Sequence, residues 1–193
     1  MQAVDHELDD RSSELIHPAE AHAVLSACSS RSPTGLRNRA LVALLWRAGL
    51  RPGEALALRP ADVDLEAGTV RVMGRRGPRV CGLDPVALRA LTEWTVRRDR
   101  LSRRWTVDPA EAPLLCTLGG REVQPSYVRE LLRRLAARAG VPRRVHAMGL
   151  RYACAAEMGS EGVAGAAIEA QLGLPAPGGT GRYLPRPGPA DLG

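Results

Sequence analysis

The 193-residue sequence has no lysine, no phenylalanine and only 3% aromatic residues. All 27 basic side chains are therefore arginines, set against 21 acidic ones, for a formal net charge of +6. No stretch approaches the roughly 20 apolar residues that a membrane-spanning helix needs. The N-terminal segment MQAVDHELDDRSSEL is acidic, whereas a signal peptide begins with basic and then apolar residues. The composition argues against a membrane-bound or secreted protein.

Metal-binding and redox motifs are also missing. None of the cysteines belongs to a Cys-x-x-Cys pair, and we expect all of them to be reduced, buried thiols. These residues are Cys28, Cys81, Cys116 and Cys154. The four histidines form no His-Glu-x-x-His motif or comparable ligand set. The sequence therefore predicts no metal ion and no other cofactor.

The positive charge is concentrated in one third of the chain. Residues 89–151 carry 14 arginines against six acidic side chains, a net charge of +8 that exceeds the total of the whole chain. Clustered arginines displace counterions from a phosphate backbone, so this asymmetry favours a nucleic-acid partner. A solvated helix surface is the alternative.

The hydrophobic pattern predicts a single domain, mainly α with a small antiparallel β-hairpin or sheet (α+β). Hydrophobic residues make up 45% of the chain, enough for a compact core. Apolar residues at helical spacing, with proline near the first turn or glycine after the last, predict the helices. We expect them over Pro18–Ser29, Asn38–Leu50, Pro52–Leu58, Pro85–Arg104, Ser126–Ala139, His146–Met158 and Val163–Leu172.

A β-hairpin is predicted from two short runs rich in valine, Thr69–Met73 and Arg79–Leu83, joined by the glycine-containing tip Gly74–Pro78. Ser30–Gly35 is expected to be a loop. So is Ala110–Gln124, with room for a short strand over Leu114–Thr117.

The helix predicted over Ser126–Ala139 has the clearest amphipathic pattern. Its apolar side chains face one way, and its arginines lie mostly on the other sides. The apolar set is Val128, Leu131, Leu132, Leu135 and Ala139, and the basic set is Arg129, Arg133, Arg134 and Arg138. The basic side either faces DNA or is a solvated outer surface.

Three residues are candidates for chemistry on a phosphodiester. Arg51 lies between two predicted helices, where it also fits a helix-capping role. Arg151 lies inside an apolar helix, where an arginine needs a buried anionic partner or a ligand. Tyr183 follows a glycine-rich loop. Arginines are suited to holding a phosphodiester through paired hydrogen bonds, and a nearby tyrosine can attack it.

The order and spacing of these residues resemble the catalytic domain of the tyrosine recombinases, the phage integrase family. The first block, AGLRPGEALAL, contains Arg51 and a glutamate three residues later. The second is Gly149-Leu150-Arg151, and the third is Leu172-Gly173 followed ten residues later by Tyr183. The resemblance extends over residues 13–185.

The resemblance implies DNA strand cleavage and rejoining, as in site-specific recombination or integration. Arg51 and Arg151 would hold the scissile phosphate, and Tyr183 would form a 3′-phosphotyrosyl intermediate. Neither ATP nor a metal ion is implied. The implied partner is double-stranded DNA, on which the family assembles homotetramers, and the implied location is the cytoplasm, at the nucleoid.

Other positions depart from the family pattern. Arg75 stands at the hairpin tip in place of a lysine that acts as general acid. Met148 replaces a histidine, for which His146 can substitute only if the helix begins after it. Leu174 replaces a histidine or tryptophan. Losing a positioned proton-transfer group costs about 10² to 10⁴ in rate. A catalytically degenerate DNA-binding relative, acting as an accessory or regulatory protein, is therefore the alternative to an active enzyme.

The domain organisation follows from the same comparison. We expect residues 1–12 to be a flexible tail, residues 13–185 the catalytic domain and residues 186–193 a disordered tail. The family usually carries an N-terminal helical domain that closes a clamp on DNA, and the sequence begins where the catalytic domain begins. An accessory recombinase or a clamp-domain protein is thus a further expected partner. Tetramer formation is left open, and so is a truncated remnant of a gene.

Overall fold

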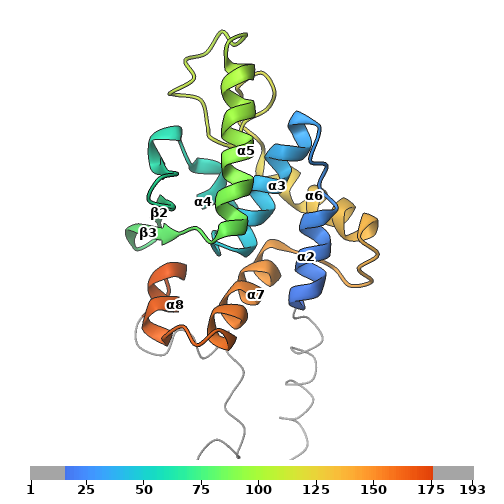
Figure 1. Cartoon of the computed structure of the whole chain (residues 1–193), viewed down its shortest axis with the longest axis vertical. Helices are drawn as coiled ribbons and strands as arrows, with labels where there is room; N and C mark the ends of the chain where they lie inside the picture. Colours follow the sequence, from blue (N-terminus) through green and yellow to red (C-terminus); the bar gives the residue numbers. More distant parts are fainter. Residues whose placement is uncertain (1–15, 176–193) are drawn as a thin grey trace, which may run out of the picture.

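The computed structural model describes residues 16–175, and in them the chain is mostly helical (Figure 1). The helices are α2 (Pro18–Ser26), α3 (Pro33–Trp46), α4 (Pro52–Ala57), α5 (Pro85–Ser102), α6 (Pro125–Arg138), α7 (Ala147–Ser160) and α8 (Gly165–Leu172), with a 3-10 turn at Pro60–Asp62. The predicted fold class is confirmed. Tyr183 lies outside the described residues, and so do both predicted tails, residues 1–12 and 186–193.

Helix α3 is the centre of the molecule and packs against α2, α4, α5 and α7. Its buried side chains lie on all sides, which is the pattern of a core helix. The helix begins at Pro33, so the prediction that Ser30–Gly35 is a loop was wrong for its second half. Ser32 accepts a hydrogen bond from the Gly35 amide (3.1 Å), and this cap with the proline after it starts the helix.

The predicted hairpin is part of a three-stranded antiparallel sheet of strand order β1 (Val63–Asp64), β2 (Thr69–Gly74) and β3 (Gly77–Gly82). The predicted tip of five residues was too long, because Gly74 pairs with Gly77 and only Arg75 and Arg76 form the turn. Pro78 is tolerated within β3 because β3 is an edge strand.

The predicted strand at Leu114–Thr117 was also wrong, since this stretch contains only an isolated bridge between Cys116 and Glu122. Side chains hold the segment instead. The indole of Trp94 donates to the carbonyl of Leu114 (2.7 Å), and Arg37 donates to that of Cys116 (3.2 Å).

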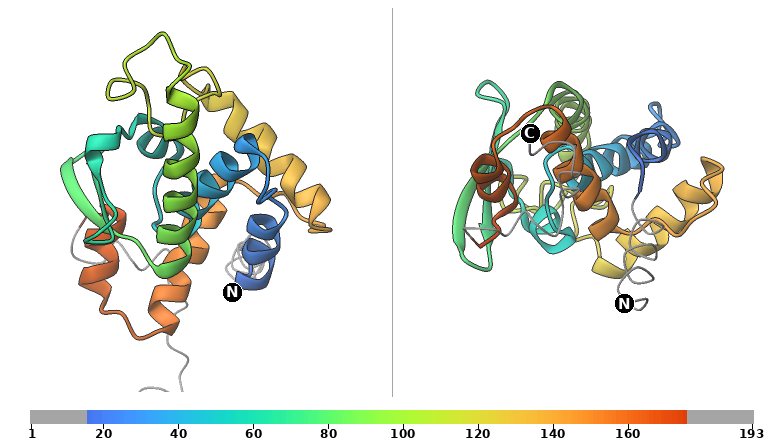
Figure 2. Two further views of the ribbon diagram at one scale, coloured as in Figure 1. Left: turned by 45° about the horizontal axis from the view of Figure 1, so that its top comes forward. Right: turned by 90° about the horizontal axis from the view of Figure 1, so that it is seen from below.

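Helices α4 and α8 both lie against the sheet, α4 beside β2 and α8 beside β3. In Figure 1 and in both views of Figure 2, helix α6 and the β2–β3 hairpin lie on opposite sides of the molecule. The N-terminal end of α6 nevertheless reaches α4, which it contacts. The short helix α4 is therefore the element on which the sheet and the basic helix converge.

Candidate active site

Arg51 is the N-cap residue of α4 and has an extended backbone, while Pro52 occupies the first helical position. The helix start is closed by Glu54, whose Oε2 accepts from the Arg51 amide (2.9 Å). Oε1 of Glu54 accepts from Nη1 of Arg51 (2.9 Å). The Arg51 side chain is 31% exposed. The guanidinium is therefore held by Glu54 through Nη1 and is only partly covered, so part of the side chain remains accessible to a ligand.

Glu54 is also held by Arg79 of β3, a residue that the sequence did not single out. Nη1 and Nη2 of Arg79 donate to the two carboxylate oxygens of Glu54, at 2.9 and 2.7 Å. Burial opposes ionisation of Glu54, but the hydrogen bonds from Arg79 and Arg51 outweigh it and lower the pKa of the carboxyl to about 2. Glu54 therefore stays charged at neutral pH between two arginines.

Arg151 lies in α7 and is fully buried. Nη1 donates to the carbonyl of Gly49, and Nη2 donates to the carbonyl of Leu172. Gly49 lies in the first sequence block, two residues before Arg51, and Leu172 is both the last residue of α8 and the first residue of the third block. One guanidinium thus joins the three blocks that lie far apart in the sequence. The sequence predicted an anionic partner or a ligand for this arginine, and these two partners are instead neutral backbone carbonyls.

His146 is the N-cap residue of α7, which begins at Ala147. The condition set by the sequence, that the helix starts after this histidine, is met. Nδ1 of His146 accepts from the Gly149 amide (2.9 Å), so the ring carries its proton on Nε2, which can donate a hydrogen bond. Met148 is 37% exposed in the first turn of the same helix, and Leu174 packs against the core.

A cavity of about 610 Å³ lies beside Pro52, the residue that follows Arg51. Residues 125–133 of α6 and residues 144–147 line it, and they include Arg129, Arg144 and His146 beside several apolar side chains. Its one acidic side chain, Glu130, is bound by Arg133 through both oxygens (3.0 and 2.7 Å). The basic side chains of the lining outnumber the acidic one, so the cavity carries a positive charge that attracts an anion.

Arg75 is exposed at the turn of the hairpin. Gly74, which precedes it, lies so close to α4 that a Cβ atom there would be 3.4 Å from Oε1 of Glu54. The structure therefore gathers the hairpin tip, the contacts of Arg151 and the cavity with His146 around the start of α4. Tyr183 and Thr180 lie outside the described residues.

Not all of the arginines in residues 89–151 face outward. Arg98 is 3% exposed, and its Nη2 donates to the carbonyls of Pro109 (2.7 Å) and Ala112 (2.9 Å). The arginines of α6 are exposed, and they are Arg129, Arg133, Arg134 and Arg138. The count of basic residues therefore includes two buried arginines, Arg98 and Arg151, besides the surface group.

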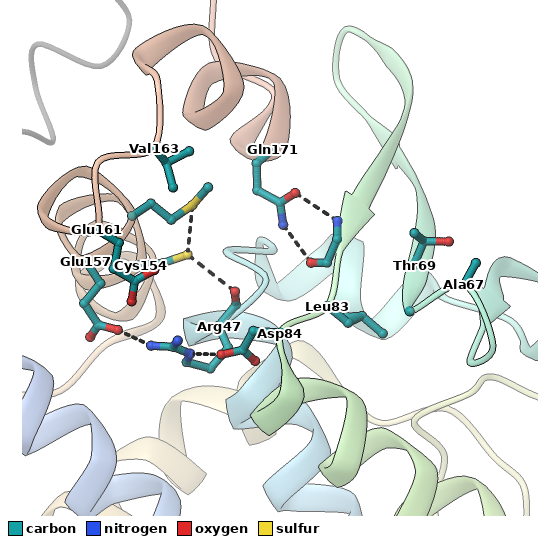
Figure 3. Close-up of a pocket in the computed structure, with 13 residues that line it drawn as sticks. Arg47, Ala67, Thr69, Leu83, Asp84, Cys154, Glu157, Glu161, Val163 and Gln171 are labelled. Atoms are coloured by element: carbon teal, nitrogen blue, oxygen red, sulfur yellow. Dashed lines mark hydrogen bonds and ion pairs between the residues drawn. The ribbon is translucent and has the colours of Figure 1, made fainter.

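A second cavity, of about 390 Å³, lies between α7, α8 and the sheet (Figure 3). Arg47 crosses its floor and pairs with Asp84 and Glu157. Gln171 of α8 bonds to the backbone of β3, accepting from the Gly82 amide (2.9 Å) and donating to the Gly82 carbonyl (3.0 Å). These contacts fasten α7 and α8 to the rest of the domain.

All four cysteines are free and buried, as predicted. Burial raises the pKa of Cys28 to about 11 and that of Cys154 to about 12. Residues 16–175 contain no cluster of His, Cys, Asp or Glu side chains suited to a metal ion. Within the same residues, every helix is too short or too polar to cross a bilayer.

The sequence profile of the phage integrase family matches residues 14–185, so the protein belongs to the phage integrase family. Two similar relatives are tyrosine recombinases named XerC. The protein from Xylella fastidiosa (strain 9a5c) is 34% identical over 128 residues, covering 66% of this chain and 41% of the relative. That from Pelotomaculum thermopropionicum is 25% identical over 160 residues, covering 82% and 52%. The chain thus spans about half the length of these relatives.

Solved structures share the fold. The XerA recombinase superposes with a TM-score of 0.75 at 25% identity, covering 88% of this chain and 59% of that one. The XerH recombinase bound to its palindromic difH substrate gives 0.74 at 22% identity, covering 90% and 49%. The catalytic core of lambda integrase gives 0.61 at 13% identity, covering 82% and 90%.

Proposed function

We propose that residues 13–185 form the catalytic domain of a tyrosine-type site-specific recombinase that cleaves and rejoins double-stranded DNA. The observation that carries this proposal is the position of Arg151, which donates to Gly49 in the block of Arg51 and to Leu172 in the block of Tyr183. Membership of the phage integrase family supports it. The substrate places the activity in the cytoplasm, at the nucleoid.

In the proposed reaction, the hydroxyl oxygen of Tyr183 attacks the scissile phosphorus while Arg51 and Arg151 hold the phosphoryl oxygens. The bond between phosphorus and the 5′ oxygen breaks, and a 3′-phosphotyrosine forms. The two guanidiniums offset the extra negative charge of the pentacoordinate transition state. A 5′-hydroxyl from a partner strand reverses the step, so the phosphoester energy is kept and no ATP is consumed.

The proposed role of Arg151 requires a rearrangement. Its guanidinium is fully covered, and its terminal nitrogens donate to two carbonyls. A phosphoryl oxygen therefore has to displace the carbonyl of Leu172 at the end of α8. Charge-assisted bonds to a phosphate are stronger than bonds to a neutral carbonyl, so bound DNA favours the exchange.

The leaving 5′ oxygen needs a proton. Two groups near the start of α4 are candidates, Arg75 at the hairpin tip and His146 beside the cavity. An arginine donates hydrogen bonds but gives up its proton poorly. We propose that the proton lost by the Tyr183 hydroxyl is the one gained by the leaving 5′ oxygen. In this proposal Nε2 of His146 donates a hydrogen bond to that oxygen, and Arg75 hydrogen-bonds the phosphate.

Duplex DNA is proposed to lie across the 610 Å³ cavity and the exposed arginines of α6. Strand exchange needs two duplexes and hence several subunits, so we propose a homotetramer on DNA. An accessory recombinase or a clamp-domain protein is the further proposed partner.

A duplex nicked next to the cleavage position tests the reaction, because loss of a short fragment traps the covalent adduct. The probe is the set of duplexes selected by this protein from a random-sequence pool. The wild type should form an adduct that disappears in Tyr183→Phe. Tyr127→Phe, the same change at a tyrosine bonded to Asn38 (3.0 Å), should retain it. No adduct on selected duplexes contradicts the proposal.

A second candidate is a DNA-binding relative that does not cleave, which is favoured by Met148, Leu174 and Arg75 standing where the family has proton-transfer or phosphate-binding groups. It predicts duplex binding that weakens with salt and is lost when Arg129, Arg133, Arg134 and Arg138 are neutralised. Each phosphate contact removed should lower the slope of log affinity against log salt by about 1. Tyr183→Phe should then change nothing. A structural remnant would not bind DNA at moderate salt.

A further inference from the structure

Arg79 is a charged residue on the inner face of the sheet. It lies on the same side of β3 as the buried Cys81, while Val80 between them is exposed. Its side chain is 11% exposed and points to α4 and α8. A guanidinium in this position needs full compensation, because removing it from water is costly.

Three hydrogen bonds supply that compensation. Two go to the carboxylate of Glu54, and the third runs from Nε to the carbonyl of Gln171 (3.0 Å), in the last turn of α8. The last carbonyls of a helix have no partner inside it and carry partial negative charge. Arg79 and Arg151 thus hold two successive carbonyls, those of Gln171 and Leu172, at the end of α8.

Two glycines enclose the Arg79 side chain. A Cβ atom at Gly74 would lie 2.7 Å from Nη1, and one at Gly173 would lie 3.1 Å from Nη1 and from Cδ. Gly74 adjoins Arg75 at the hairpin tip, and Gly173 ends α8 in the left-handed conformation. The guanidinium therefore fills the space between the hairpin, α4 and the end of α8.

We propose that Arg79 is a positioning residue for the cleavage reaction. Through Glu54 it sets the orientation of Arg51, and through the carbonyl of Gln171 it fixes the point from which the chain continues to Tyr183. One side chain thereby relates the phosphate ligand, the hairpin tip and the end of α8, from which the sequence continues to the nucleophile. The inference rests on the function proposed above.

Arg79→Lys separates positioning from folding. Lysine keeps the charge and most of the stem, so attraction to Glu54 remains. An ammonium group is a point donor and does not reproduce the fork that binds both carboxylate oxygens while also reaching Gln171. Arg71→Lys is the matched control, since Arg71 is exposed on the adjacent strand and lies 3.7 Å from Asp62.

The measurement is the single-turnover rate of adduct formation at saturating protein, alongside the dissociation constant for the same nicked duplex. Misplacing reacting groups by about 1 Å costs about 10²-fold in rate. Arg79→Lys should therefore slow adduct formation by about 10²-fold with a nearly unchanged dissociation constant, and Arg71→Lys should change neither. Glu54→Gln should slow it as well. The double variant should be no slower than the worse single variant, because both act through one network.

Gly74→Ala is a second probe that leaves Arg79 present but displaces its guanidinium. It should also lower the rate, whereas Gly119→Ala, where a Cβ atom meets nothing within 4 Å, should not. A wild-type rate in Arg79→Lys, or a loss equal to that in Arg71→Lys, overturns the positioning role while leaving the recombinase function intact. A wild-type protein that forms no Tyr183-dependent adduct overturns both.

Discussion

The guanidinium of Arg151 donates a hydrogen bond to the carbonyl of Gly49. Gly49 has a φ of +65°, in the left-handed region that ends α3 and turns the chain toward Arg51. The backbone conformation of this glycine therefore places both the acceptor of Arg151 and the start of α4. A substitution at Gly49 should therefore affect both proposed phosphate ligands, Arg51 and Arg151, although it changes neither side chain.

Gly49→Ala should destabilise the fold by about 2 to 4 kcal/mol, from backbone strain and overpacking together. The added Cβ atom would lie 2.3 Å from Cδ2 of Leu172. Gly140→Ala is the control, because Gly140 has a φ of +68° but meets nothing within 4 Å. It should cost only the backbone strain of about 1 kcal/mol. Urea unfolding measures both, and equal losses would contradict the packing argument.

Glu54→Gln should make stability less sensitive to acid. The pKa of Glu54 is about 2 in the folded protein and about 4.5 when unfolded, so its contribution is complete above pH 4.5 and disappears as pH falls to 2. The stability difference between wild type and variant should shrink by something on the order of 2 kcal/mol over that interval.

Urea unfolding at pH 6 and pH 3 measures this difference. Glu130→Gln is the control: hydrogen bonding from Arg133 also lowers the pKa of Glu130, but this carboxylate is exposed and solvent screens the pair. Its effect on the acid response should be far smaller. A Glu54→Gln variant with a constant deficit at both pH values would disprove the linkage.

Arg75→Lys should raise the rate of DNA cleavage, by up to about 10²-fold, because a lysine supplies a proton more readily than an arginine. The assay is adduct formation on the nicked duplex. Arg76→Lys, the adjacent turn residue, is the matched change and should have no such effect. A slower Arg75→Lys enzyme would mean that the guanidinium has a role that an ammonium group does not fill.

His146 caps α7 and has a proposed role in DNA cleavage, and two substitutions distinguish these roles. Asparagine retains an oxygen that can accept from the Gly149 amide but does not titrate. Alanine loses the cap as well, at about 1 kcal/mol. We expect His146→Asn to fold stably and to cleave DNA at least about 10²-fold more slowly. If His146→Asn cleaves as fast as wild type, the histidine is only a helix cap.

The helices and the order of the site blocks could be predicted because they are local properties. The spacing of leucines in α3 and the proline at the first position of α2 to α6 are visible in the sequence. The first turn of α3 was missed because Ser-Pro also begins loops, and the hydrogen bond from the Gly35 amide to Ser32 that starts the helix is seen only in the structure. The predicted hairpin tip was too long because Pro78, which lies in β3, was counted as a turn residue.

The contacts that organise the site could not be predicted. In a chain with 27 arginines, no local pattern identifies Arg79 as the partner of Glu54, 25 residues away. Nor does any local pattern show that Arg98 is buried and donates hydrogen bonds to the loop that follows α5. These pairings depend on which helix faces which strand. Alternation along β3 was the one available signal, since it places Arg79 on the same side as Cys81.

Gln171 covers part of the exposed edge of the sheet, which is a role separate from catalysis. Strand β3 is an edge, and an edge with unpaired backbone groups is a template for strands of other molecules. The carboxamide of Gln171 takes up both the amide and the carbonyl of Gly82, as a neighbouring strand would. Pro78, farther along β3, has no amide to offer. The exposed edge of the arginine-tipped hairpin is thus protected at both ends against pairing with strands of other molecules.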